Sequence, residues 1–118
     1  MNLLRTLLIV GWLVVAWATF RGVSSLGLGA AGDFFLGDMS HPWRGQFNLD
    51  FLAHLLLTGL WLGWSAKNKW LGPVIVICAA VGGGLFSLAY LLVRSFGGDR
   101  NIGHVLLGRH HTNRTAVK

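Results

Sequence analysis

Hydrophobic residues gather in three long runs along this chain, and polar segments separate the runs. The first, at about residues 3–20, is near the shortest length that crosses the hydrocarbon core of a bilayer. The second, at about 47–65, carries Asp50 and His54, and the third, at about 71–93, contains no charged residue. This pattern predicts an all-α integral membrane protein with three transmembrane helices.

The polar segments predict two smaller features. Gly22–Gly45 is rich in glycine, and its middle, LGLGAAGDFFLG, is too short and interrupted to span a membrane. We expect an interfacial helix or a re-entrant turn in this first loop. From about residue 94 the chain is a basic polar tail, in which Ile102–Leu107 is expected to form one amphipathic turn lying on the membrane. Residues 1–118 are expected to form a single transmembrane domain.

The second and third runs have distinct faces when they are drawn as helices of about 100° per residue. Polar side chains form one stripe on the second run: Gln46, Asp50, His54, Thr58, Trp61 and Ser65. Small residues at spacings of four form rows that are typical of close helix packing: Gly59 and Gly63, and Ala79, Gly83 and Ser87. The three glycines at 82–84 leave one turn bare, which is compatible with crowded backbones, a bend or a flat ligand.

Composition supports the membrane prediction, because 53% of residues are hydrophobic and only 12% are charged. The formal net charge is +6, from ten Lys and Arg against four acidic residues. These basic residues flank or follow the apolar runs, where they favour contact with anionic lipid headgroups over nucleic acid. Cys78 is the only cysteine, which excludes a disulfide framework.

Charge also bears on orientation. With three spans, the first loop and the tail share a side that holds most of the basic residues, and the positive-inside rule favours a cytoplasmic C-terminus. The N-terminus would then lie outside. Arg5, at the start of a signal-like helix, favours the opposite.

Three spans would also bring the unusual polar residues to one membrane face. These are Asp50, His54, Arg44, Arg21, Tyr90 and Arg94. Placing an unpaired carboxylate in hydrocarbon costs roughly several kcal/mol. Asp50 should therefore find a partner or take up a proton. We therefore expect a cluster in which Asp50 pairs with one of these arginines, and His54 bonds to Asp50, Thr58 or a partner.

Several functions would use this cluster. Metal binding would use His54 with Asp50, together with His41 or a histidine of the tail, although the D-x-x-x-H spacing is common by chance. A haem or chlorophyll-type pigment would take His54 as its axial ligand. Catalysis is the least favoured, since no nucleophile motif, phosphate loop or carboxylate pair accompanies these residues.

Polar contacts between helices or subunits explain the cluster most simply, because such contacts are favourable where water is absent. Three short helices with glycine-rich faces bury little surface, so other membrane subunits or self-association are expected. The sequence favours a small non-enzymatic accessory or assembly subunit of a larger membrane complex. The alternative is a cofactor-, pigment- or metal-binding membrane protein using His54 with Asp50.

The run HPWRGQFNLDFLAHLLL, with GLFSLAYLL and LLGRH further on, resembles a group of short bacterial multi-span membrane proteins of unknown function. This resemblance implies a protein of the bacterial inner (plasma) membrane with three or four hydrophobic segments. It implies no activity, cofactor or catalytic residue.

Overall fold

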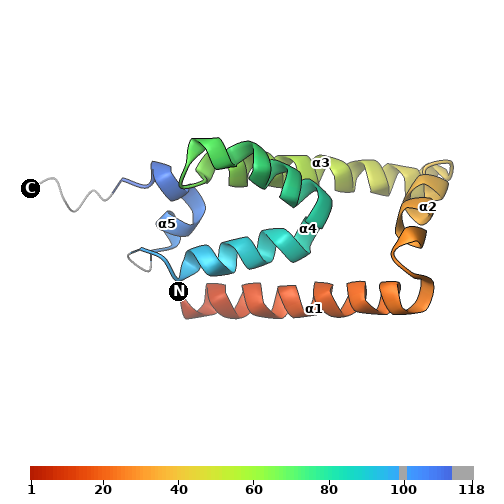
Figure 1. Ribbon diagram of the computed structural model, residues 1–118, viewed down its shortest axis with the longest axis horizontal. Helices are drawn as coiled ribbons and strands as arrows, with labels where there is room; N and C mark the ends of the chain where they lie inside the picture. The colour runs from red at the N-terminus through yellow and green to blue at the C-terminus, as the bar shows by residue number, and fades with distance from the viewer. Residues whose placement is uncertain (99–100, 113–118) are drawn as a thin grey trace, which may run out of the picture.

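The computed structural model describes residues 1–98 and 101–112, and this part of the chain is helical without any strand. Its elements are α1 (Asn2–Leu26), α2 (Gly29–Asp38), α3 (Pro42–Ser65), η1 (Lys69–Leu71), α4 (Gly72–Ser95), α5 (Ile102–Leu107) and η2 (Gly108–His110). In Figure 1, α1 and α3 run along the long axis, and α2 crosses between them at one end. We call this the α2 end. The opposite end, which carries Met1, η1, α5 and both termini of α4, is called the terminal end.

Two helical segments are long and apolar enough to cross a membrane: α1 and the segment Lys69–Ser95, which joins η1 to α4. They support a membrane location. α3 has 24 residues, which is long enough to cross a membrane. Its polar side chains lower its hydropathy, however, and it is not a third segment of this kind. The three predicted spans are therefore not confirmed as such. α1 also extends past the predicted end at Phe20, and it stops at Gly27, whose φ is 80°.

α4 is bent, which is one of the alternatives that the glycine run at 82–84 left open. Gly83 has φ 55° and ψ −137°, a conformation that only glycine adopts readily. The chain therefore turns back halfway along α3, so that both termini of α4 lie at the terminal end (Figure 1). The glycine run at 82–84 thus marks a sharp change of direction.

The first limb of α4, residues 72–82, packs closely against α3. Leu62, Ala66 and Ala79 are fully buried where the two helices meet. A Cβ added at Gly63 would lie 2.8 Å from the carbonyl oxygen of Gly72, and one at Gly59 would lie 3.2 Å from a carbonyl oxygen of the same limb. Both glycines of the predicted row therefore face α4 of the same chain.

The second limb of α4, residues 84–95, packs against α1. The indole Nε1 of Trp12 donates to the carbonyl oxygen of Leu85 at 3.0 Å. Nearer the terminal end, Arg5 Nη2 donates to the carbonyl oxygen of Ser95 at 2.7 Å. Ser87 is buried in this limb. An indole donor and a guanidinium donor thus fix the returning limb to α1.

Beyond the bend, the helices lose their neighbours. The last ten residues of α1 are exposed, as is most of α2 and of the first half of α3. α2 is the helix expected in the first loop, and Asn48 of α3 donates to the carbonyl oxygen of Phe35 at 3.2 Å to hold it in place. The α2 end is therefore an open frame, whereas the terminal end is filled by α4 and α5.

Candidate functional site

Asp50 and His54 form a local pair on α3. His54 Nδ1 lies 2.8 Å from the backbone carbonyl oxygen of Asp50 and 3.6 Å from its carboxylate Oδ1. A carbonyl oxygen only accepts, so Nδ1 carries the proton in this bond. In the neutral ring, Nε2 is then the unprotonated nitrogen. The side chains of Asp50 and His54 are 58% and 69% exposed, respectively.

The pair lies among exposed apolar side chains and flanks the midpoint of α3, which runs from residue 42 to residue 65. Phe47, one turn before Asp50, is 67% exposed, and Leu57 is equally exposed. A carboxylate and an imidazole thus lie in the middle of an outward-facing apolar helix. Within residues 1–98 and 101–112, the only salt-bridge partner of Asp50 is His54.

The structure separates the residues that were predicted to cluster with this pair. Arg44 Nε lies 3.4 Å from Asp38 Oδ1, and Arg21 lies over the ring of Trp17. Arg94 lies at the terminal end and donates from Nη1 to Ser65 Oγ at 2.8 Å. The expected cluster is therefore wrong as an arrangement.

The bend at Gly83 is the physical reason why two of these residues, Arg94 and Tyr90, are separated from Asp50. It returns the end of α4 to the terminal end (Figure 1), so Arg94 and Tyr90 lie near Ser65 at the end of α3, whereas Asp50 lies near the middle of α3. Arg94 instead lies 6.0 Å from the ring centroid of Tyr90. Of the expected cluster, Asp50 stays beside His54 and Tyr90 stays beside Arg94, because each pair is one turn apart on a single helix and does not depend on topology.

The structure does not assemble the weak metal candidates. His41 caps the start of α3, where its side chain accepts a hydrogen bond from the backbone N–H of Arg44 at 3.3 Å. No group of three His, Cys, Asp or Glu side chains suited to a metal occurs among the described residues. His54 and Asp50 therefore remain a pair without a third protein ligand there.

A second site, at the terminal end, did not follow from the sequence. A cleft of about 340 Å³ lies between the end of α4, the α3–η1 connection and α5–η2. It is lined by Lys67, Tyr90, Val93, Arg94, His104, Gly108 and Arg109. The basic residues were visible in the sequence, but the three-span topology placed Lys67 and Arg94 on opposite sides of the membrane.

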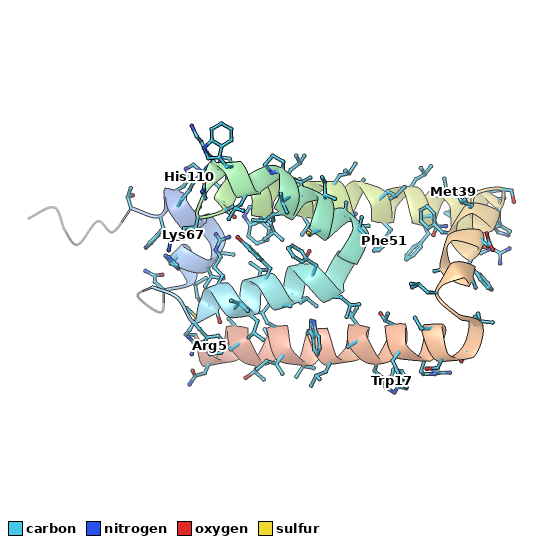
Figure 2. All side chains as sticks on the ribbon, viewed as in Figure 1. Arg5, Trp17, Met39, Phe51, Lys67 and His110 are labelled. Carbon is cyan, nitrogen blue, oxygen red and sulfur yellow. The ribbon has the colours of Figure 1, made fainter. Side chains whose placement is uncertain are left out.

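The C-terminal segment forms one wall of this cleft. Trp61 Nε1 of α3 donates to the carbonyl oxygen of Leu106 at 3.0 Å, and the His110 ring stacks on Trp64 with 4.0 Å between centroids. Figure 2 shows His110 and Lys67 together at this end, with Met39 at the other. α5 has the predicted bounds, and it packs over the ends of α3 and α4. The predicted basic tail also includes Arg100, Arg114 and Lys118, which lie outside the described residues.

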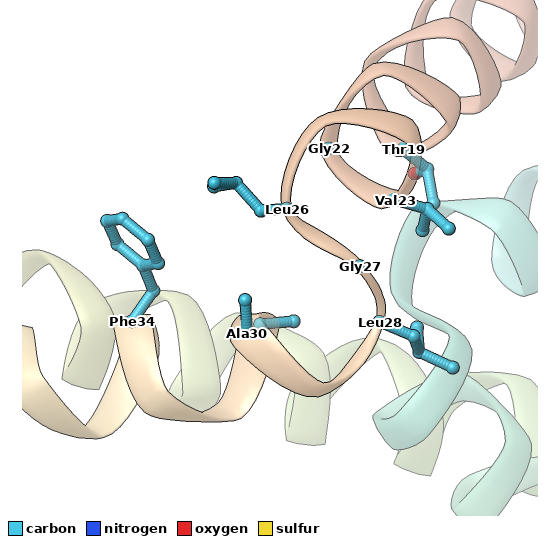
Figure 3. A pocket seen from close by; sticks show the side chains of 9 residues that line it. Thr19, Gly22, Val23, Leu26, Gly27, Leu28, Ala30 and Phe34 are labelled. Carbon is cyan, nitrogen blue, oxygen red and sulfur yellow. The ribbon is translucent and has the colours of Figure 1, made fainter.

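An apolar hollow of about 250 Å³ lies where α1 meets α2. Leu26, Leu28 and Phe34 extend around it, as Figure 3 shows, and Gly27 forms the turn between the two helices. Its lining carries no charged group. We interpret the hollow as an apolar packing surface at the α2 end.

Comparison with protein-family models, with curated proteins and with solved structures gives no match to this chain.

Proposed function

We propose that this chain is a non-enzymatic accessory or assembly subunit of a larger complex in a bacterial inner membrane. The observation that carries the proposal is the Asp50–His54 pair, exposed at the middle of α3. If α3 crosses the bilayer, both side chains lie near its midplane. Polar groups there are costly, and they commonly bind to polar groups of neighbouring helices.

The partner surface follows from the exposed residues. Phe47, Asp50 and His54 share one face of α3, since they are separated by three and four positions. A transmembrane helix with small residues and a hydrogen-bond donor at mid-depth would cover this face. Such a donor would satisfy the carboxylate of Asp50, which has only His54 beside it in the described part of the chain.

The open frame at the α2 end supports the same role. α4 turns back before it reaches the α2 end (Figure 1), and the apolar residues beyond the bend are exposed. Contacts between membrane helices depend on close packing, which these residues lack within one chain. Added helices from other subunits would supply it.

Photo-crosslinking in the native membrane tests the proposal. A photoreactive amino acid replaces Phe47, on the face of Asp50, or Leu56, nine positions later and about 180° around the helix. Both positions are exposed, at 67% and 54%. We expect a defined crosslink to another membrane protein from position 47 and not from 56, and its loss in Asp50→Leu/His54→Leu. Equal crosslinking from both positions overturns the proposal, and so does a product of twice the chain's own mass, which would assign the face to self-association.

A second candidate function has one specific observation in its favour. Because His54 Nδ1 donates to the carbonyl oxygen of Asp50, Nε2 of the neutral ring is free to bind a metal centre. This is the arrangement in which a histidine serves as axial ligand to a haem or chlorophyll-type pigment. Such a protein shows a visible absorption band when it is purified or supplied with haem, and His54→Ala abolishes the band. His41→Ala is the control and keeps it. Bands that are unchanged in His54→Ala would exclude this function.

The distribution of basic residues suggests an orientation. Among the described residues, the terminal end carries five of them: Arg5, Lys67, Lys69, Arg94 and Arg109. The basic residues toward the α2 end, Arg21 and Arg44, share it with Asp33 and Asp38. The positive-inside rule therefore favours a multi-pass protein with the terminal end, and so both the N-terminus and the C-terminal segment, in the cytoplasm.

A further inference from the structure

We propose that the cleft at the terminal end binds the phosphate group of an anionic phospholipid. Lys67, Arg94 and Arg109 reach this cleft from three different segments of the chain. His104 adds an imidazole, and none of the lining residues is acidic. The described carboxylates of Asp33, Asp38 and Asp50 belong to α2 and α3 and lie away from this end. The cleft therefore presents positive charge without a counter-ion among the described residues.

The partly buried guanidinium of Arg94 adds an independent reason. Its Nη1 donates to Ser65 Oγ, but Nε and Nη2 are buried and find no acceptor among the described residues. Nδ1 of His104 is likewise buried and has no hydrogen-bond partner among the described residues. Charges attract more strongly in a poorly solvated site than in water, so Arg94 favours an anion in the cleft even without direct contact.

The backbone holds this guanidinium in place. Gly108 has φ 53°, and a Cβ at this position would collide with the carbonyl oxygen of Ser65 and with the Arg94 guanidinium. A glycine therefore lets α5–η2 close directly over Arg94. The two exposed cations, Lys67 and Arg109, are then the groups that can contact a phosphate at the rim.

The apolar walls distinguish a lipid from a free anion. Val93 and the ring of Tyr90 line the cleft beside the cations, at the end of the apolar helix α4. A phospholipid has its phosphate at this depth, directly above apolar chains. The volume of about 340 Å³ is that of a small-molecule site and accommodates a headgroup. The proposal is independent of the partner-binding face of α3, because the cleft lies at the terminal end, the Asp50–His54 face lies at the middle of α3, and the two sites share no residue.

Lipid titration followed by native mass spectrometry tests the proposal. The full-length protein in mild detergent is titrated with phosphatidylglycerol and, separately, with phosphatidylcholine. We expect one tightly retained phosphatidylglycerol, with binding weakened about tenfold or more in Lys67→Ala/Arg109→Ala. The matched control is Lys69→Ala/Arg21→Ala, which removes the same charge from positions outside the cleft and keeps wild-type binding.

The remaining outcomes each count against the site. Equal weakening in both double variants would show a general charge effect and overturn it. Equal retention of phosphatidylcholine would exclude selection of an anionic headgroup. Inorganic phosphate that displaces the lipid at equal concentration would assign the cleft to free anions instead. Circular dichroism of each variant verifies the helical fold, which these exposed side chains do not determine.

Discussion

At the scale of the residue, Gly83 decides the path of the chain. Its φ of 55° and ψ of −137° strain any side chain, so we expect Gly83→Ala to destabilise the protein by about 1–3 kcal/mol. Gly84→Ala is the matched control. A Cβ at position 84 would lie 3.5 Å from Val15, an ordinary contact in a helical conformation, and should stabilise by up to about 1 kcal/mol. Unfolding in mixed detergent measures the stability of both variants. A Gly83→Ala protein as stable as the wild type would contradict the bend.

Gly63 decides how closely α3 and α4 approach each other. A Cβ there would lie 2.8 Å from both the carbonyl oxygen of Gly72 and Cγ2 of Val76, so the two helices must separate. We expect Gly63→Ala to cost about 1–3 kcal/mol in the same unfolding measurement. Gly22→Ala is the control, because nothing lies within 4 Å of a Cβ at that position. Similar midpoints for the two variants would show that α3 and α4 are not in close contact.

At the scale of the element, the Trp12 indole donates one of the hydrogen bonds that join the returning limb of α4 to α1. Trp12→Phe keeps an aromatic ring but removes the Nε1 donor to the carbonyl oxygen of Leu85. We expect a loss of about 1 kcal/mol and faster hydrogen exchange in residues 84–95. Trp17→Phe, at an indole that is 60% exposed, should change neither quantity. Unchanged exchange in Trp12→Phe would show that the limb is held by other contacts.

The elements also show what could be predicted from the sequence. The helical segments followed from apolar runs, and Ile102–Leu107 was predicted with the bounds that α5 has. The direction of α4 did not follow, because hydropathy is the same for a straight helix and a bent one. Three consecutive glycines at 82–84 are compatible with either path. Packing against α1 and α3 selects the bent one, and periodicity contains no information about that packing.

The candidate site was predictable to the extent that it is local. Asp50 and His54 are one turn apart on any helix, so their proximity needs no topology. The expected contacts with Arg94 and Tyr90 depended on which end α4 reaches, and they were lost with the straight span. The same dependence hid the cleft, since Lys67 and Arg94 meet only when α4 returns to its starting end.

At the scale of the whole molecule, the bend changes the predicted topology. In Cys78→Ser protein, single cysteines replace Ser40, Lys67 and Gly97 in turn. We expect an impermeant maleimide to label positions 67 and 97 from the cytoplasmic side and position 40 from the other, because 67 and 97 share the terminal end. Inside-out and right-side-out vesicles distinguish the sides. A straight α4 would instead place positions 40 and 97 on the same side.

The bend has one more consequence, for the shape that the molecule presents to a lipid layer. α1, α3, both limbs of α4 and α5 contribute to its cross-section at the terminal end, whereas only α1, α2 and α3 contribute at the α2 end (Figure 1). In a bilayer, such a wedge occupies more area in one leaflet than in the other. The energy of the protein in the membrane then depends on membrane curvature. This energy would be lowest where the leaflet around the terminal end is stretched.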